Sequence, residues 1–424
     1  MIERRIIPIS SGKGGVGKTT VALNYALSLS RYARTVLIDL DTGTSSVRST
    51  VPGDVAHDLY HFKRKGVPLR DCISRLDPQL DPDGLYKNFG FIAGPRNFIQ
   101  EIANPDAAFR RQLAQEVSRL PAEYVVLDLR AGLDENVLDF LPYSNSGILV
   151  FTPQHPAATL AASEIVKAIL FRSLRILFGK GSTFYTLPRM ERYFGFINDM
   201  LDRVEDVYET SLPNLDAFLV ELREALGDHP ILRVLTDTLE TFRVYYVLNM
   251  FNGVEEGYQR AVVPFVENLT RHVSSHLNVT QLGWVVADER IHRANCEGVP
   301  AVIERRRREE AHPRTAPLDP VMAELERLES AALGLRRRER PPAVARAARP
   351  EPPRAPMDLL DGQLQTLKAM YADRTKDTVR ENFSYVAYRA LNLMSASYGN
   401  NEFGTTQLAA PERLLDWYMS RQPA

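Results

Sequence analysis

The stretch Ile9-Ser10-Ser11-Gly12-Lys13-Gly14-Gly15-Val16-Gly17-Lys18-Thr19-Thr20 decides the fold of this chain. It holds the complete pattern G-x-x-x-x-G-K-[ST] between residues 4–11, which we expect to form a buried strand, and residues 17–32, which we expect to form a helix. Glycines let the backbone turn so that successive amides point at phosphate oxygens, and the start of the helix adds its positive dipole. The stretch therefore predicts a phosphate-binding loop.

The residues of this loop have separate expected tasks. Lys18 is expected to reach the β- and γ-phosphates of a nucleotide, and Thr19 to place its hydroxyl on Mg²⁺. The expected nucleotide contacts within the loop are Gly12, Gly14, Gly15, Val16, Gly17, Lys18, Thr19 and Thr20.

Continuous apolar runs recur downstream of the loop and alternate with helical patterns. This is the signature of a parallel sheet covered by helices on both faces. We therefore expect an α/β fold with a mostly parallel, doubly wound P-loop sheet, in a domain spanning residues 1–304. The expected strands after residues 4–11 are 35–39, 124–128, 147–151, 242–250 and 281–287.

Three regions lie outside this regular alternation. Residues 180–240 carry leucine and phenylalanine at three- and four-residue spacing, which predicts a two- or three-helix insertion on the rim of the sheet. Residues 305–356 read as an Arg/Pro-rich linker, within which 320–335 have the pattern of a short acidic amphipathic helix and 336–356 have no periodicity. Residues 357–424 carry helical stripes, so we expect a small helical C-terminal module, or helices that fold only against a partner.

The composition is that of a globular chain long enough for two or three domains. Of its 424 residues 44% are hydrophobic and 25% are charged, and its formal net charge is −1. These values exclude wholesale disorder and a basic field over the whole protein. The N-terminus lacks the apolar segment of a signal peptide, and the longest apolar stretch, 168–178, is too short to span a bilayer. We therefore expect a cytoplasmic chain.

Lysine is scarce in this chain, with nine lysines against forty-three arginines. Two of the nine, Lys13 and Lys18, frame the loop, and with Lys13 the segment resembles the deviant Walker A loop of the MinD/ParA family in the SIMIBI class of P-loop ATPases. The motifs are nearest to the MinD and flagellar-number-regulator branch. The resemblance implies that Lys13 crosses a dimer interface to touch the partner subunit's nucleotide, so that ATP binding and dimerisation are coupled.

Acidic residues at two strand ends extend the resemblance. The sequence from Asp39 through Asp41 to Gly43 is similar to the family's D-x-D-x-G, and the sequence from Asp128 to Gly132 is similar to its Walker B and switch segment. The likeness implies that Asp41 orients or activates the attacking water and that Asp39 lies near Mg²⁺. It also implies that Asp128 holds a Mg²⁺-bound water and that the Gly132 amide faces the γ-phosphate. Strand-end aspartates also cap turns, which is the structural alternative.

Two later segments resemble the part of the family that surrounds the nucleotide base. Asn249 follows an apolar run like the asparagine that pairs with adenine, for which an amide has a donor and an acceptor on one edge. The run from Leu282 to Asp288 resembles the family's terminal strand and helix, and places Asp288 among the expected nucleotide contacts. Val286 stands where a proline is usual in the family.

Other sites are less favoured by the sequence. Relatives that carry an iron–sulfur cluster need paired cysteines, an arrangement that Cys72 and Cys296 do not provide. His57 and His61 share a predicted helical face with Asp58, but no third metal ligand is evident. Residues 411–421 form an amphipathic aromatic stretch that either inserts into a membrane or packs against protein, and packing is favoured by its mixed charge. The arginines of the linker suit a solvated tether, with DNA or anionic lipid as the alternative.

These observations together predict an ATP-binding and ATP-hydrolysing switch. Mg²⁺ is the expected metal, with Thr19, Asp39 and Asp128 around it, while Lys13, Lys18 and Asp41 carry the chemistry. The expected partners are a second copy in the presence of ATP and a protein that binds the insertion and the C-terminal module. The alternatives are a nucleotide-sensing scaffold with negligible hydrolysis and a ParA-like protein with ATP-dependent DNA binding.

Overall fold

The computed structural model describes most of the chain, namely residues 5–41, 46–179, 181–182, 191–206, 211–227, 229–303, 356–374 and 378–396. Gly43, almost all of the predicted linker 305–356 and the predicted amphipathic stretch 411–421 lie outside the described residues. The chain divides into two compact units, of which one comprises residues 1–304 and 354–424 and the other residues 305–353. Every described residue belongs to the first unit.

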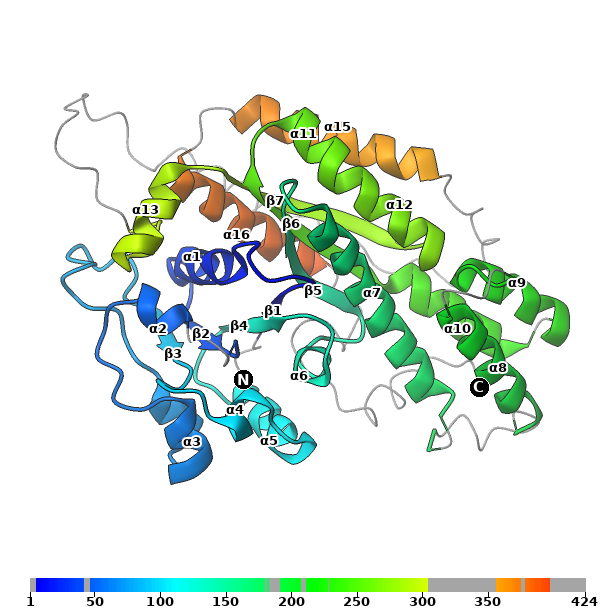
Figure 1. The fold of residues 1–424 in the computed structure, drawn as a ribbon, viewed down its shortest axis with the longest axis horizontal. Coiled ribbons are helices and arrows are strands. Elements are labelled where there is room, and N and C mark those ends of the chain that lie inside the picture. The colour runs from blue at the N-terminus through cyan, green and yellow to red at the C-terminus, as the bar shows by residue number, and fades with distance from the viewer. Residues whose placement is uncertain are drawn as a thin grey trace, which may run out of the picture. The chain divides into compact units, whose positions relative to one another are not determined.

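A seven-stranded sheet forms the centre of this unit (Figure 1). Its strands are β1 (Arg5–Ser11), β2 (Thr35–Asp39), β3 (Phe89–Ile92), β4 (Tyr124–Ala131), β5 (Asn145–Phe151), β6 (Arg243–Phe251) and β7 (Asn278–Val286). Their order is β3-β2-β4-β1-β5-β6-β7, and every neighbouring pair is parallel. The predicted α/β class with a parallel, doubly wound sheet is confirmed.

Helices connect these strands, as right-handed crossovers between parallel strands require. Before β6 they are α1 (Lys18–Ser30), α2 (Ser46–Thr50), α3 (Leu59–Lys65), η1 (Leu69–Cys72), α4 (Gln100–Ala103), α5 (Ala107–Val117), α6 (Glu135–Leu138), α7 (Pro156–Leu177), α8 (Glu191–Glu205), α9 (Leu215–Leu226) and α10 (Pro230–Thr241). After β6 they are α11 (Val254–Gly257), the π-helical turn η3 (Tyr258–Val262), α12 (Val263–His272), α13 (Glu289–Glu297), α15 (Pro356–Arg374) and α16 (Val379–Ala396).

The strands alternate their side chains between two hydrophobic cores, one on each face of the sheet. Ile7 and Ile9 of β1 belong to the core that α1 and α16 cover, whereas Ile6 belongs to the core that α5, α7, α12 and α15 cover. Since both faces are buried, the strands read as continuous apolar runs in the sequence. The helices α8, α9 and α10 occupy the region of the predicted insertion and extend the second core beyond α7 (Figure 1).

The helices α15 and α16 cover the edge strand β7. The Gln363 side chain donates to the Val279 carbonyl at 2.8 Å, and Arg389 donates to the Gln281 carbonyl at 2.9 Å. The Val286 amide donates to the Asn382 side chain at 3.3 Å. An edge strand exposes unpaired backbone groups that invite another strand, so these contacts close an edge that would otherwise be open.

The helix α16 also packs against α1, the helix that begins at the phosphate loop. Val379, Phe383 and Val386 are buried in the same core as the inner face of α1. Gly283 in β7 leaves room for this packing, because a Cβ on it would lie 2.8 Å from a methyl group of Val386. The predicted boundary at residue 357 stays a prediction, but α15 and α16 lie in the same compact unit as residues 1–304.

The strand β3 was not predicted from the sequence. The four residues of β3 include Gly90, which has poor strand propensity, and lie between turns without a helical pattern to frame them. Gly90 fits there because a Cβ would lie 2.6 Å from the Ile73 side chain. Its pairing with β2 and a β-bridge between Phe91 and Ser74, both tertiary contacts, make this segment a strand.

Replacing Phe383 tests whether α16 is part of the core. We expect Phe383→Ala to lower the free energy of unfolding by about 3–5 kcal/mol, because a fully buried ring is lost and a cavity is left. Urea unfolding of the full chain measures this. Met357→Ala, which removes a side chain that is 66% exposed, is the matched control and should change the value by less than about 0.5 kcal/mol. Equal stabilities of the two variants would show that α16 is not packed on the sheet.

Candidate functional site

The predicted site residues meet at the carboxyl edge of the sheet, where all its parallel strands end. β1 is the strand at which the order reverses, since β4 lies on one side of it and β5 on the other. A crevice outside the carboxyl ends at such a reversal is the usual ligand position in open α/β sheets. The loop of residues 12–17 leaves β1 at this point and leads into α1.

The loop has the backbone conformation that its glycines permit. Gly15 and Gly17 have φ values of 80° and 78°, in the left-handed region that non-glycine residues avoid. Gly17 is also the residue that precedes α1, and it leaves the first amides of that helix without a side-chain cap. Free amides at a helix N-terminus, next to a left-handed turn, form an anion-binding concavity.

Lys18 is buried against the carboxylates at the ends of β4 and β2. Its ammonium lies 2.6 Å from Asp128 Oδ1 and 3.5 Å from Asp41 Oδ2. Burial alone would favour the neutral amine, but the charges of Asp128 and Asp41 outweigh it and raise the pKa of Lys18. Lys18 therefore stays cationic, as a group that binds phosphate must.

Asp39 organises the backbone that carries Asp41. It is fully buried, and its two carboxylate oxygens accept hydrogen bonds from the amides of Asp41 at 3.2 Å and Val47 at 3.4 Å. This is the turn-capping role expected of a strand-end aspartate. Asp41 itself is half-buried and keeps one oxygen near Lys18.

The donor set at the strand ends fits Mg²⁺. Thr19 lies beside the Asp128 carboxylate and stabilises its charge, while Asp39 ends the neighbouring strand in register with Asp128. Magnesium prefers one or two carboxylates, a hydroxyl, water and phosphate oxygens to a cage made by the protein alone. Among the described residues no group of three His, Cys, Asp or Glu side chains is arranged to hold a metal.

The amide of Gly132 has a partner within the chain, whereas the side chain of Lys13 is exposed. The Gly132 amide, predicted to face a γ-phosphate, donates to the Ser11 carbonyl at 3.0 Å, so the chain itself occupies this donor. The register between β1 and β4 shifts here, and this shift brings Ser11 opposite Ala131. Lys13 lies at the exposed tip of the loop, where its side chain is accessible to a second molecule.

The two residues predicted at the base end have partners within the chain. Asn249 donates from Nδ2 to the Val16 carbonyl at 2.7 Å, under the phosphate loop. Asp288 caps α13 by accepting from the Arg290 amide, and its ion pair with the Arg290 side chain lowers the pKa of Asp288. The roles of both residues toward a base stay predictions.

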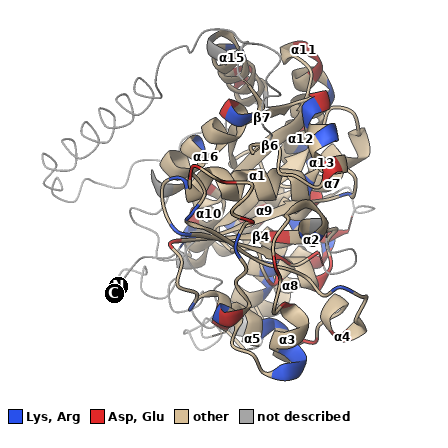
Figure 2. Cartoon of the chain, turned by 90° about the vertical axis from the view of Figure 1, so that its left-hand side faces the viewer, with Lys and Arg blue, Asp and Glu red and all other residues tan. Residues whose placement is uncertain are grey.

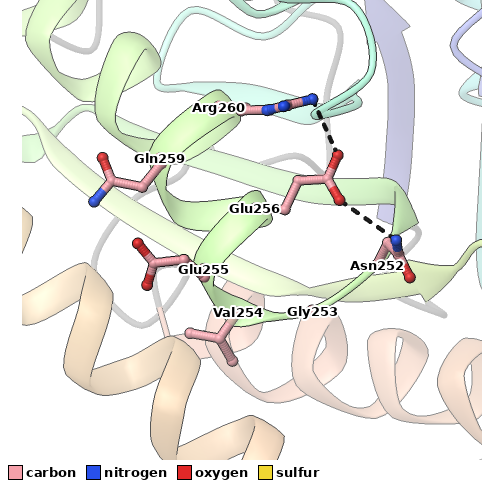
Figure 3. A pocket seen from close by; sticks show the side chains of 7 residues that line it. All are labelled: Asn252, Gly253, Val254, Glu255, Glu256, Gln259 and Arg260. Atoms are coloured by element: carbon pink, nitrogen blue, oxygen red, sulfur yellow. Dashed lines mark hydrogen bonds and ion pairs between the residues drawn. The ribbon is translucent and has the colours of Figure 1, made fainter.

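A pocket of about 520 Å³ opens just beyond Asn249, after the end of β6 (Figure 3). Glu256 accepts hydrogen bonds there from Asn252 and Arg260, both at 3.4 Å, and Glu255 adds a second carboxylate. The wall of this pocket therefore carries one ion pair and one further carboxylate.

A contact that the sequence analysis missed joins α13 to the loop. Asn295 exchanges hydrogen bonds with the Thr20 hydroxyl, at 3.2 and 3.4 Å. Thr20 therefore interacts with another part of the chain rather than standing free for a ligand. The two residues are 275 positions apart, and no local pattern signals such a pair.

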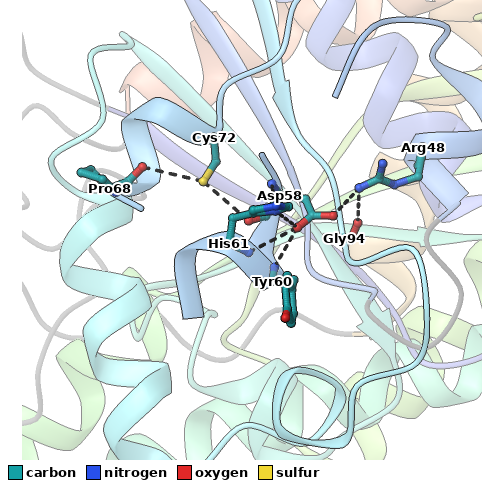
Figure 4. A network of polar contacts seen from close by, with 7 residues as sticks. All are labelled: Arg48, Asp58, Tyr60, His61, Pro68, Cys72 and Gly94. Carbon is teal, nitrogen blue, oxygen red and sulfur yellow. Dashed lines mark hydrogen bonds and ion pairs between the residues drawn. The ribbon is translucent and has the colours of Figure 1, made fainter. Parts of the chain in front are cut away.

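A partly buried polar network surrounds Asp58 (Figure 4). Arg48 of α2 donates to Asp58 Oδ2 at 2.5 Å and to the Gly94 carbonyl at 3.1 Å. Asp58 caps α3 in a capping box with His61, and the Cys72 thiol contacts the Asp58 carbonyl, where burial raises the pKa of the thiol to about 11. Of the three residues considered above as a metal site, Asp58 and His61 thus have a structural task, and the His57 ring packs against His61.

Basic residues lie at the C-terminal end of α3 (Figure 2), and each has a partner within the chain. Lys63 lies over the Phe109 ring at 4.2 Å, Arg64 pairs with Glu101 at 2.7 Å, and Lys65 lies 6.0 Å from the Tyr60 ring. Cations at a helix C-terminus also interact favourably with the negative end of the helix dipole.

In the described part of the chain, no helix is both long and apolar enough to cross a membrane.

The sequence of this chain is similar to those of several known proteins. A family model described as an AAA domain matches residues 4–171. A putative septum site-determining protein MinD from Chlorella vulgaris is 30% identical over 151 residues, which is 35% of this chain and 51% of that protein. The chloroplastic MinD homologue of Arabidopsis thaliana is 32% identical over 155 residues, 35% of this chain and 45% of that protein. The chain thus spans about half the length of these curated relatives.

Longer alignments have lower identity. The MinD protein of Synechocystis is 23% identical over 276 residues, covering 63% of this chain and 94% of the relative. Among solved structures, the cell division ATPase MinD of Pyrococcus furiosus is 16% identical, covers 77% of this chain and 99% of its own, and has a TM-score of 0.40. The two MinD relatives described above, at 30% and 32% identity, each align with 35% of this chain.

Breaking the buried ion pair tests its energetic weight. We expect Lys18→Met to lower the free energy of unfolding by about 3 kcal/mol without nucleotide, because the Asp128 charge is left buried and unpaired. The double variant Lys18→Met/Asp128→Asn removes that charge and should recover most of the loss. Urea unfolding at neutral pH measures both. A single variant as stable as the wild type, or a double variant no better than the single one, would contradict the buried pair.

Proposed function

We propose, from the premise that the chain is a member of the MinD/ParA family of P-loop ATPases, that it is a Mg²⁺-dependent ATP switch that positions a cellular structure. The observation that carries the proposal is the convergence of Lys18, Asp128 and Asp41 beneath a glycine loop whose tip presents Lys13. Its relatives include septum site-determining proteins. The structure that is positioned is a division site, flagellum, chromosome or other cargo.

Each residue has a task in binding ATP. The ammonium of Lys18 exchanges carboxylate partners for phosphate oxygens, which carry more charge and lie in the concavity of the loop. Thr19, Asp39 and Asp128 hold Mg²⁺ and its waters, and the ion supplies neutralisation of phosphate charge. Movement of Lys18 toward phosphate also frees the Asp41 carboxylate that it contacts.

Hydrolysis requires that a water be oriented toward the γ-phosphate. Asp41 is suited to this because its carboxylate is half-buried at the site while the Asp39 side chain holds its backbone. An oriented carboxylate accepts a hydrogen bond from water and restricts its direction of attack. Release of phosphate then returns Lys18 to its carboxylate partners and resets the switch.

Dimerisation depends on the exposed Lys13. An ammonium at the tip of the loop is attracted to the triphosphate of a second subunit, and its charge is better compensated in a dimer that excludes water. Two ATP-loaded copies therefore associate, and the paired surface binds the partner protein. The three helices of the insertion are a candidate for that contact.

Replacing Lys13 tests the dimer. With Mg-ATP we expect the wild-type chain to double its mass in light scattering and Lys13→Ala to stay monomeric, because the bridging charge is lost. Lys87→Ala is the matched control, since Lys87 is also exposed but precedes β3 at the opposite edge of the sheet. If Lys13→Ala dimerises as the control does, Lys13 does not bridge the two subunits.

Replacing Asp41 separates a switch from a scaffold. We expect Asp41→Ala to dimerise with ATP but to release phosphate about 100-fold more slowly than the wild type, because the water is no longer oriented. Phosphate release is measured together with light scattering. If the wild type shows no turnover under any condition, with a partner included, the chain is a nucleotide-sensing scaffold.

A further inference from the structure

Asn249 holds the main chain of the phosphate loop from below. Its side chain is 5% exposed, and its Nδ2 donates to the Val16 carbonyl at 2.7 Å. The contact joins the carboxyl end of β6 to the loop between β1 and α1, over 233 positions of sequence. A buried amide this close to a buried carbonyl forms a full hydrogen bond.

The loop is shaped to receive this side chain. A Cβ on Gly17 would lie only 2.2 Å from Asn249 Nδ2, so the loop approaches Asn249 more closely than any residue other than glycine allows. Gly17 is also in the left-handed conformation, with φ of 78°. The glycine is thus required by two independent constraints, of which one is Asn249 itself.

The strand is distorted where it presents Asn249. Pairing between β6 and β7 shifts register between Leu248 and Phe251, and Met250 has a φ of 53°, the only positive value among the described non-glycine residues. A bulge re-aims a side chain, and a left-handed methionine is strained unless its surroundings hold it. The distortion therefore coincides with Asn249, whose side chain lies under the loop.

The contact has a consequence for the amide on the other side of the same peptide. In a planar trans peptide the carbonyl of one residue and the amide of the next point in opposite directions. Because the Val16 carbonyl points down to Asn249, the Gly17 amide points away from Asn249, toward the concavity of the loop. That amide is one of the donors that cradle a phosphate at the start of a helix.

We propose that Asn249 is a positioning residue of the phosphate loop, which orients the Gly17 amide toward a bound polyphosphate by holding the Val16 carbonyl, independently of any contact with a base. The inference rests on the proposed binding of ATP at this loop. Without the Asn249 amide the buried Val16 carbonyl lacks its partner, and the peptide between Val16 and Gly17 is free to rotate. The loop then binds phosphate less tightly.

Inorganic tripolyphosphate separates this role from recognition of adenine, because it carries the phosphates without a base. Displacement of a fluorescent ATP analogue by tripolyphosphate and by ATP is measured for the full-length chain in the presence of Mg²⁺. We expect Asn249→Ala to weaken both ligands by about tenfold, the usual scale for a lost buried hydrogen bond. Asn249→Asp keeps the shape but places an acceptor against the carbonyl, and should weaken both at least as much.

Asn145→Ala is the matched control. Asn145 is equally buried, at 5% exposure, but lies at the amino end of β5, on the edge of the sheet away from the loop. We expect it to lower stability without changing the affinity for tripolyphosphate. Should Asn249→Ala fail to fold, the comparison rests on Asn249→Asp, whose volume is that of the wild-type side chain.

Two results overturn the inference. One is an affinity of both Asn249 variants for tripolyphosphate equal to that of the wild type, with only ATP weakened, since Asn249 then acts through the base. The other is a wild type that binds ATP but not tripolyphosphate. The proposed ATP site itself is refuted if the wild type binds neither ligand, or if Lys18→Ala binds both ligands as tightly as the wild type. Both outcomes differ from the two results that overturn the role of Asn249.

Discussion

The ion pair between Lys18 and Asp128 is the interaction on which the arrangement of the site depends. Burying an ammonium and a carboxylate costs several kcal/mol, which is recovered only when the two charges meet in good geometry. That geometry requires β4 beside β1 and α1 beginning at the end of β1, because Lys18 is the first residue of α1 and Asp128 lies in β4. The order of the central strands and the position of the loop are therefore coupled to one charge pair.

The edge strand β7 imposes a second constraint, which the C-terminal part of the chain satisfies. Two of its carbonyls accept hydrogen bonds from side chains of α15 and α16, and one of its amides donates to a side chain of α16. The same helices cover its apolar residues. These helices belong to the same compact unit as β7, although residues 305–353 separate them from it in the sequence.

The helix α16 is also connected by hydrogen bonds to the end of the molecule that carries the phosphate loop. Arg380 donates to the Val302 carbonyl at 2.9 Å, and the Val302 amide donates to Asn24 of α1. Asn24 in turn donates to the Thr20 carbonyl in the first turn of α1. A chain of hydrogen bonds thus runs from α16 to the residues next to the phosphate loop.

The sequence by itself determined the loop and the class of fold. The spacing of Gly12, Gly17 and Lys18 is a local pattern, and a left-handed turn followed by a helix depends only on residues close in sequence. The apolar runs of β1, β2, β4, β5, β6 and β7 were likewise recognisable, because strands buried on both faces need continuous apolar residues.

Only the tertiary structure decided what lies beside these residues. It turned the Gly132 amide to Ser11, placed Asn249 under Val16, joined Asn295 to Thr20 and laid α16 on β7. Each of these contacts links segments far apart in the chain, and each depends on register shifts or packing that no window of sequence contains. The physical reason is that a hydrogen bond is set by distance and direction in space, which sequence neighbours alone do not specify.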